Sequence, residues 1–216
     1  MKRIRSFATP HRGLRNVLGK FSLRLGLTNF ENPQQLKELK ELGNEMFTLL
    51  NDHVNTENNH TLKHLEERAR GASKHDHDDH ERLELIQASL EKQVKEFTGK
   101  ESPDEIHNFY LSFSLFHSQY LEHIHEEETV TELLMQKYFS DEELIQHRMA
   151  IMKKLEFPML LLWMKYVIPA QPESESIGML SGLKQNAPGE AFQSVLSIIK
   201  PEMDIDRFNR LMTLLH

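Results

Sequence analysis

The sequence predicts an all-α protein, in which an up-down-up-down four-helix bundle is followed by additional C-terminal helices. Apolar residues recur with the period of an α-helix through most of the chain. Strong helix-start signals separate these stretches. The chain has 216 residues but only 9 Gly and 8 Pro, which favours long elements over a turn-rich β fold. Hydrophobic residues make up 38% and charged residues 27%, so the chain is globular and large enough to bury a core.

Each expected helix combines a start signal with an apolar stripe. The start signals are Thr9-Pro10, Asn32-Pro33, Ser73 followed by Asp76, Ser102-Pro103 with Glu105, and Ser140 followed by Glu143. We expect the bundle helices over 10–26, 33–70, 74–98 and 103–139, and a further helix over 141–155.

The C-terminal part is expected to be a helical extension. Its features are an apolar segment around Trp163, breaks at Pro169 and Pro172, and short helices that begin near Pro188 and Asp204. We therefore predict two domains, the four-helix bundle in 1–155 and an extension packed on the bundle in 156–216. This extension is either a packing element, a lid or a partner surface.

Composition excludes several classes of function. The net charge of −7 argues against a nucleic-acid surface, which needs a basic stripe. The chain has no Cys, so disulfides, thiolate zinc sites, iron–sulfur clusters and cysteine nucleophiles are excluded. Met1–Phe7 has no apolar signal core, and the apolar stretch Met159–Ile168 is much shorter than the roughly 20 residues of a membrane span. We predict a cytoplasmic protein without a membrane partner.

The 13 histidines of the chain include a spaced repeat. A unit of one histidine, a helix, a turn and a second helix with the pattern H-x3-E occurs twice in tandem. Its members are His11, His53 and Glu57 in the first copy, and His80, His123 and Glu127 in the second. The second H-x3-E follows the first by 70 residues, and the leading histidines are 69 residues apart.

The spacing predicts that all six side chains meet. Residues i and i+4 lie on one face of a helix, so each H-x3-E directs an imidazole and a carboxylate the same way. In an up-down-up-down bundle, the second helix of each unit returns to the end at which the leading histidine lies. Both H-x3-E pairs therefore meet both leading histidines at one end. Four imidazoles and two carboxylates suit two divalent transition ions, and burying them without a metal would be costly.

Other interpretations of these residues are open. The six could belong to a bundle with solvated histidines. The pairs Glu57/His60 and Glu122/His125 match the E-x-x-H pattern of ferritin-type sites, but they are 65 residues apart and therefore out of register with the repeat. The polar run 74–81 is either a surface metal-binding tract or a loop connection.

The chain resembles the hemerythrin-like (HHE cation-binding) family over about residues 10–155. The matching stretches are His11-Arg-Gly-Leu-Arg15, Leu49-Leu-Asn-Asp-His53-Val-Asn-Thr-Glu57, Asp79-His80-Glu-Arg-Leu83, Tyr120-Leu-Glu-His123-Ile-His-Glu-Glu127 and Phe139-Ser-Asp-Glu-Glu-Leu144.

The resemblance implies a non-haem centre of two iron ions, bridged by the carboxylates of Glu57 and Glu127 and by an oxo or hydroxo group, with zinc as a substitute. The expected ligand is O2, another small diatomic molecule or peroxide. Classical members have five histidines, so His77 is an extra ligand candidate. We favour a binding protein or a sensor of oxygen, iron or redox state over an enzyme. The alternatives are a diiron enzyme acting on peroxide or nitric oxide, and a metal-stapled regulatory protein whose protein partner is unknown.

Overall fold

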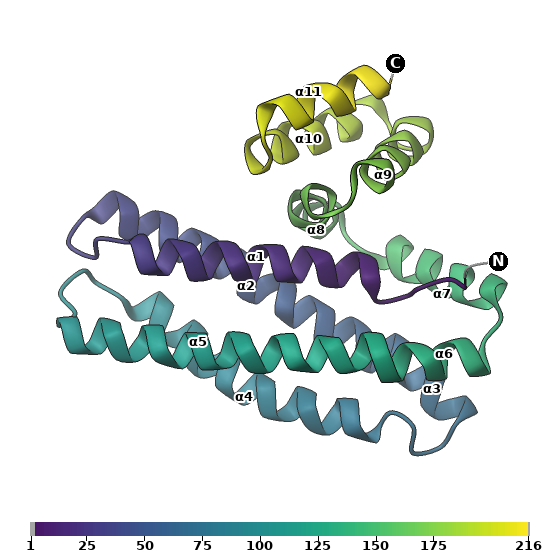
Figure 1. Ribbon diagram of the computed structural model, residues 1–216, viewed down its shortest axis with the longest axis horizontal. Helices are drawn as coiled ribbons and strands as arrows, with labels where there is room; N and C mark the ends of the chain where they lie inside the picture. The colour runs from purple at the N-terminus through teal and green to yellow at the C-terminus, as the bar shows by residue number, and fades with distance from the viewer. Residues whose placement is uncertain (1–2, 216) are drawn as a thin grey trace.

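The computed structural model describes residues 3–215, and every regular element in this range is a helix (Figure 1). The first half contains α1 (Ala8–Leu27), α2 (Pro33–Thr56), η1 (Glu57–Thr61), α3 (Leu62–Arg68) and α4 (Lys74–Glu96). After α4 come α5 (Pro103–Glu126), η2 (Glu127–Thr131) and α6 (Glu132–Tyr138). The remaining elements are α7 (Asp141–Lys154), α8 (Phe157–Ala170), α9 (Glu173–Asn186), α10 (Gly189–Ile199), η3 (Lys200–Glu202) and α11 (Ile205–Leu214).

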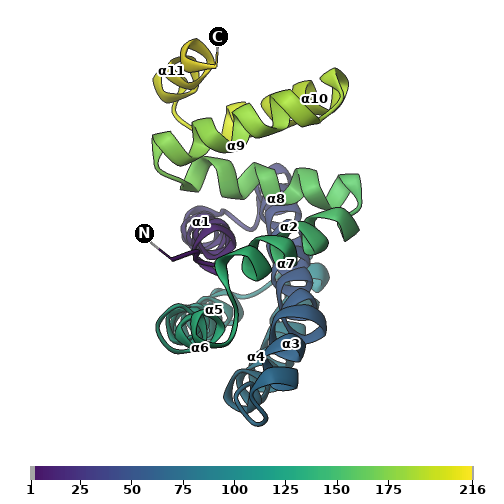
Figure 2. The ribbon, with the colours of Figure 1, turned by 90° about the vertical axis from the view of Figure 1, so that its right-hand side faces the viewer.

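Four long helices, α1, α2, α4 and α5, lie side by side around one apolar core (Figures 1 and 2). The contacts run from α1 to α2, from α2 to α4, from α4 to α5 and from α5 back to α1. The stripes that the sequence predicts face inward. Their fully buried members include Leu14, Phe21, Leu49, Phe113 and Phe116.

Three of the five predicted side-chain caps are confirmed. Asn32 caps α2, and Ser102 and Ser140 form capping boxes with Glu105 and Glu143.

The other two predicted caps are wrong. α1 begins at Ala8 with Phe7 at its cap position, so Thr9-Pro10 lies inside the first turn. The free N–H groups of Ser6 and Phe7 are instead satisfied by the Glu132 carboxylate of α6, at 2.8 and 3.2 Å. Ser73 precedes α4 at the N-cap position, as predicted, but its hydroxyl donates to the carboxylate of Glu66 and does not cap the helix.

A π-helical turn interrupts the second and the fourth long helix. η1 follows α2 and η2 follows α5, and each begins at a glutamate of the H-x3-E pattern. The backbone N–H of Leu62 reaches back to the carbonyl of Glu57, and that of Glu132 reaches back to Glu127. The predicted helices 33–70 and 103–139 are therefore continuous, but each contains one wide turn.

The C-terminal helices pack on the four-helix unit through α8, which crosses α1 and also contacts α2. The Trp163 indole donates to Asp52 at 2.7 Å, and Lys165 pairs with Glu45 at 2.6 Å. In Figures 1 and 2, α10 and α11 lie beyond α8 on the side away from α4 and α5. The apolar core continues from the four helices into α8–α11, across the predicted boundary between residues 155 and 156.

Pro169 does not break the chain as predicted. It lies in the last turn of α8, which ends at Ala170, and the extended residues that follow are Gln171 and Pro172. A proline this close to a helix end removes only a terminal hydrogen bond. Within residues 3–215, no helix is long and apolar enough to cross a membrane.

The packing of α8 on α1 depends on a missing side chain at Gly13. A Cβ atom there would lie 2.6 Å from Cγ2 of Val167, whereas a Cβ at Gly19 in the same helix would meet no atom within 4 Å. We expect Gly13→Ala to lower the free energy of unfolding by about 1–3 kcal/mol through overpacking. Gly19→Ala is the control and should raise it by up to about 1 kcal/mol through helix propensity. Urea unfolding measures both, and equal effects at the two sites would contradict the close α1–α8 contact.

Candidate metal centre

The structure places the six sequence-predicted side chains together at one end of the four long helices. The three N-terminal residues lie in α1, α2 and η1, and the three C-terminal ones in α4, α5 and η2. All are buried, with exposed fractions of 0% for His11 and Glu127, 1% for His80 and His123, and 4% for His53 and Glu57.

Each imidazole presents its Nε2 atom to one or both of the carboxylates. Nε2 of His11 lies 3.3 Å from Glu127, and Nε2 of His53 lies 3.2 Å from Glu57. Nε2 of His80 lies 3.5 Å from Glu57 and 3.6 Å from Glu127, and Nε2 of His123 lies 3.5 Å from Glu127. The six groups thus converge on one small volume from six positions in the chain.

The ligand atoms fall into two overlapping sets. One set is His11, His53, Glu57 and Glu127, and the other is His80, His123, Glu57 and Glu127. Within each set the candidate ligand atoms lie within 4.8 Å of one another. The two glutamates are common to both sets, so each set offers two imidazoles and two shared carboxylates.

The inward-facing atoms lack hydrogen-bond partners among the described residues. They are the Nε2 atoms of all four histidines, Oε2 of Glu57, and both carboxylate oxygens of Glu127. A buried polar atom without a partner costs about 1–3 kcal/mol, so a cluster of seven is unstable unless something binds it. The donor set of imidazole nitrogen and carboxylate oxygen fits divalent transition-metal ions.

Two of the outward-facing Nδ1 atoms have hydrogen-bond partners, and these orient the rings of His11 and His80. Nδ1 of His11 lies 3.0 Å from Glu128, and Nδ1 of His80 lies 2.8 Å from Oδ1 of Asn58. Nδ1 of His123 lies 3.6 Å from Asp79. A carboxylate or amide oxygen at Nδ1 holds the proton there and leaves Nε2 free as an acceptor, which is the tautomer that metal binding requires.

Burial favours the neutral forms of His53 and His123 and raises the free-energy cost of charging both glutamates. It lowers the pKa of His53 to about 4 and also lowers the pKa of His123. Burial and the neighbouring Glu127 carboxylate raise the pKa of Glu57 well above its usual range. Without a metal ion, one of the two glutamates therefore tends to hold a proton.

Apolar clusters lie on both sides of this polar layer. The main core packs beneath it through residues such as Leu50 and Phe116. A smaller cluster beyond it contains Phe7, Leu65, Met135 and Leu144. The layer is thereby shielded from water along the helix axes.

Several residues near the centre were not predicted from the sequence to belong to the site. Asp76 is buried and accepts from the hydroxyl of Thr131 at 2.9 Å, and burial raises its pKa to about 6. The Tyr120 hydroxyl is buried without a partner among the described residues. The Nδ1 partners Asn58 and Glu128 each directly follow a glutamate of the repeat, and this position is the feature of the sequence that could have identified them.

The remaining histidine candidates lie outside the centre. His77 is half-buried in α4 and belongs to neither ligand set. The polar run 74–81 lies in the first two turns of α4, not in a loop. A third potential metal-binding group, His75, Asp79 and Glu126, is more exposed to solvent.

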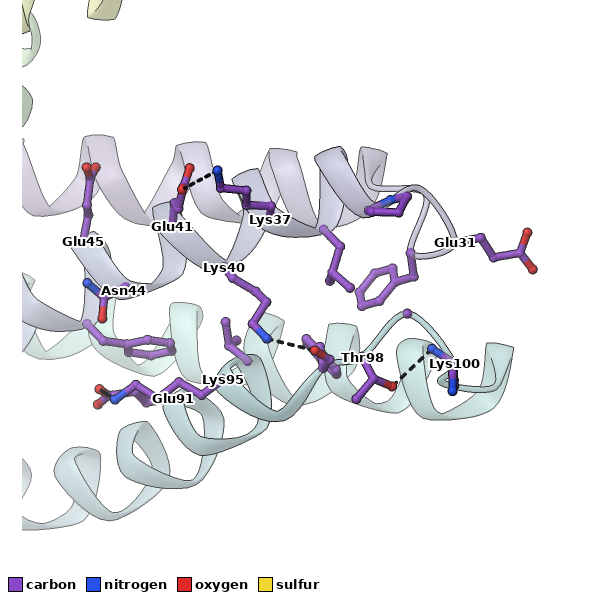
Figure 3. A pocket seen from close by; sticks show the side chains of 17 residues that line it. Glu31, Lys37, Lys40, Glu41, Asn44, Glu45, Glu91, Lys95, Thr98 and Lys100 are labelled. Carbon is purple, nitrogen blue, oxygen red and sulfur yellow. Dashed lines mark hydrogen bonds and ion pairs between the residues drawn. The ribbon is translucent and has the colours of Figure 1, made fainter.

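A separate groove of about 860 Å³ lies at the other end of the four helices, between α2 and the C-terminal part of α4 (Figure 3). The Lys40 ammonium donates to the carbonyl of Phe97, and Lys37 and Lys95 pair with Glu41 and Glu91. None of the six site residues lines this groove. It therefore has no connection with the metal-binding groups.

Together, these features define an all-helical protein with a buried cluster of histidines and glutamates able to hold metal ions. The chain is similar to F-box/LRR-repeat protein 5 of Danio rerio, with 28% identity over 141 residues, which cover 64% of this chain and 20% of that protein. The chain thus spans about a fifth of the length of this curated relative. No family profile and no solved structure matches the chain. At this identity and coverage, the similarity does not place the chain in a family.

The low pKa of His53 predicts a loss of stability in acid for the metal-free protein. Its pKa is about 4 in the folded chain against 6.5 as the reference value, so the unfolded chain binds more protons between these two pH values. The contribution of His53 to the free energy of unfolding is complete above pH 6.5. Between pH 6.5 and about 4 it decreases by up to about 1.4 kcal/mol per pH unit.

Urea unfolding of the metal-free protein from about pH 7 to pH 5 measures this slope. The His53→Gln variant is the comparison. The raised pKa of Asp76 changes the free energy of unfolding with pH in the opposite direction, but this effect is present in both proteins and cancels. Equal pH slopes in the two proteins would mean that His53 is not buried as a neutral imidazole.

Proposed function

We propose that this chain is a hemerythrin-like protein that holds two non-haem iron ions in an up-down-up-down four-helix bundle, and that it binds O2 or senses oxygen, iron or redox state. Four points support the proposal. They are the two tandem H-x3-E units, the convergence of their side chains, the combination of imidazole and carboxylate ligands, and the membership of both glutamates in both ligand sets.

The observation that carries the proposal is the pairing of the two ligand sets through Glu57 and Glu127. A site for a single ion needs only one set of four metal ligands. Two sets that share both carboxylates suit a pair of ions, because a carboxylate has two oxygens and can bridge them. Each ion of the pair would then be held by two imidazoles, His11 with His53 and His80 with His123.

Iron would supply the redox chemistry toward O2, peroxide or nitric oxide, since iron sites with imidazole and carboxylate ligands keep open positions. The protein's own residues have three tasks. The four histidines present Nε2 as metal ligands, Glu128 and Asn58 fix the rings of His11 and His80, and the flanking apolar clusters limit the access of water. Zinc is the redox-inert substitute, and a zinc-loaded chain would support a structural role.

A diiron enzyme acting on peroxide or nitric oxide is the second candidate. One observation favours it: His53 and Glu57 line a pocket of about 650 Å³, so a small substrate in that pocket would lie against the candidate centre. Catalysed loss of peroxide or nitric oxide above the rate with free iron would support this alternative.

Metal content and the response to air test the main proposal. Elemental mass spectrometry of the purified protein should give two irons per chain. After anaerobic loading with ferrous iron, admission of air should produce new visible absorption bands that reverse under vacuum if O2 binds without turnover. One zinc or no metal, with no spectral change, would refute the diiron centre.

Removing one histidine from each half should abolish stoichiometric metal binding. His53→Ala with His123→Ala deletes a donor from each ligand set, so metal no longer favours the folded state and thermal stability falls in the presence of iron. His107→Ala with His125→Ala is the control, since both residues are exposed on α5. Two bound metals in the first double variant would refute the ligand assignment.

The orienting amide at His80 should matter for affinity. Asn58→Ala removes the 2.8 Å partner of Nδ1 and should weaken metal binding about 10- to 100-fold. Asn59→Ala is a matched control, because the neighbouring Asn59 amide donates only to the carbonyl of Asn55 within its own helix. Competition with a metal chelator measures both affinities. Equal affinities in the two variants would rule out an orienting role for Asn58.

A further inference from the structure

A largely apolar pocket of about 650 Å³ lies between the metal-binding end of the bundle and helices α7, α8 and α9. Its walls include Leu144, Ile151, Met152, Leu155, Met164 and Met179. The volume falls within the range of small-molecule sites, roughly 300–1,000 Å³. Three methionines in the wall favour a flexible aliphatic ligand, since thioether side chains adapt to irregular apolar shapes.

The pocket reaches the candidate metal centre from one side. His53 and Glu57 both line it. These two residues are 4% exposed, whereas the other four members of the centre are 0–1% exposed. The small accessible surface of the centre therefore belongs to the residues that line this pocket, so a molecule bound there would lie against His53 and Glu57.

Helix α7 forms the outer wall of the pocket. Leu144 is its single fully buried residue, and Met152 is 41% exposed. Polar contacts hold the helix in place, including Asp141 with Arg3 at 2.7 Å and the side chain of His147 with Thr61 at 3.2 Å. The apolar side chains of α7 that face the pocket are thus available to cover a ligand.

One arginine in the lining favours an anionic head group. Arg148 lines the pocket and is exposed, so it lies at the mouth. Its guanidinium donates to the carbonyl of Arg5 at 2.9 Å, and no carboxylate of residues 3–215 pairs with it. Of the three acidic residues in the lining, Asp52 accepts from the Trp163 indole and Glu175 pairs with Arg12. The third, Glu57, belongs to the candidate metal centre at the opposite end of the pocket from the solvent.

We infer that this pocket binds an aliphatic monocarboxylic acid, with its chain among the apolar side chains of α7–α9 and its carboxylate at Arg148. The bound chain would lie against His53 and Glu57. Its role as a substrate or effector of the metal pair rests on the proposed function, but binding itself needs only the pocket.

Calorimetric titration of the full chain with decanoate, below its micellar concentration, tests this inference. We expect one molecule per chain and about fourfold tighter binding for each methylene added from hexanoate to decanoate. Arg148→Gln should weaken decanoate binding about fivefold and leave decanol binding unchanged. Lys153→Gln is the charge control on the same helix, and it should change neither.

A pair of glycines in α9 tests the location. Gly178 lines the pocket, and a Cβ added there would meet no atom within 4 Å. Gly182 has equal space but does not line the pocket. Gly178→Leu should fill the pocket and abolish decanoate binding, whereas Gly182→Leu should preserve it. Equal binding in the two glycine variants, no saturable binding, or equal affinity for decanoate and decanol would overturn the inference.

The titration is performed on metal-free and iron-loaded protein with the metal content of each measured. Decanoate binding without stoichiometric iron would leave the pocket established and refute the diiron centre. Two irons per chain without decanoate binding would support the diiron centre and refute the fatty-acid pocket. In the iron-loaded protein, decanoate should also shift the visible absorption bands, since its chain lies beside His53 and Glu57.

Discussion

Four imidazoles and two carboxylates are buried side by side, and an apolar cluster lies above and below them. This arrangement is unfavourable in isolation, because their inward-facing atoms have no hydrogen-bond partner within the described chain. The surrounding structure is organised to hold these groups in place. Glu128 and Asn58 fix the rings, and Glu132 ties down the start of α1 from which His11 projects. A bound metal pair would convert this cost into folding free energy.

The helices and the meeting of the six side chains were predictable from the sequence, because both follow from short-range spacing. The period of the apolar stripes fixes which face is buried, and i,i+4 spacing brings His53 to Glu57 and His123 to Glu127. Capping boxes at Ser102 and Ser140 are likewise local, since each needs only a partner three residues away.

What the sequence did not predict depends on contacts between distant segments. The start of α1 is set by Glu132, which is 125 residues from Phe7 along the chain, and this contact overrides the local signal of Thr9-Pro10. The 3.6 Å approach of Asp79 to His123 and the burial of Asp76 against Thr131 also link separate helices. The pocket beside the centre is built from three C-terminal helices, and no spacing rule connects their residues to His53.

The wide turns η1 and η2 have a consequence for the history of the chain. Each places one extra residue in its helix, and both begin at the glutamate of the repeat, 70 residues apart. Thr61 and Thr131, which close the two turns, keep the same offset and are both buried. A half-length ancestor that already carried the insertion, and whose gene was then duplicated and fused, accounts for both turns by a single event.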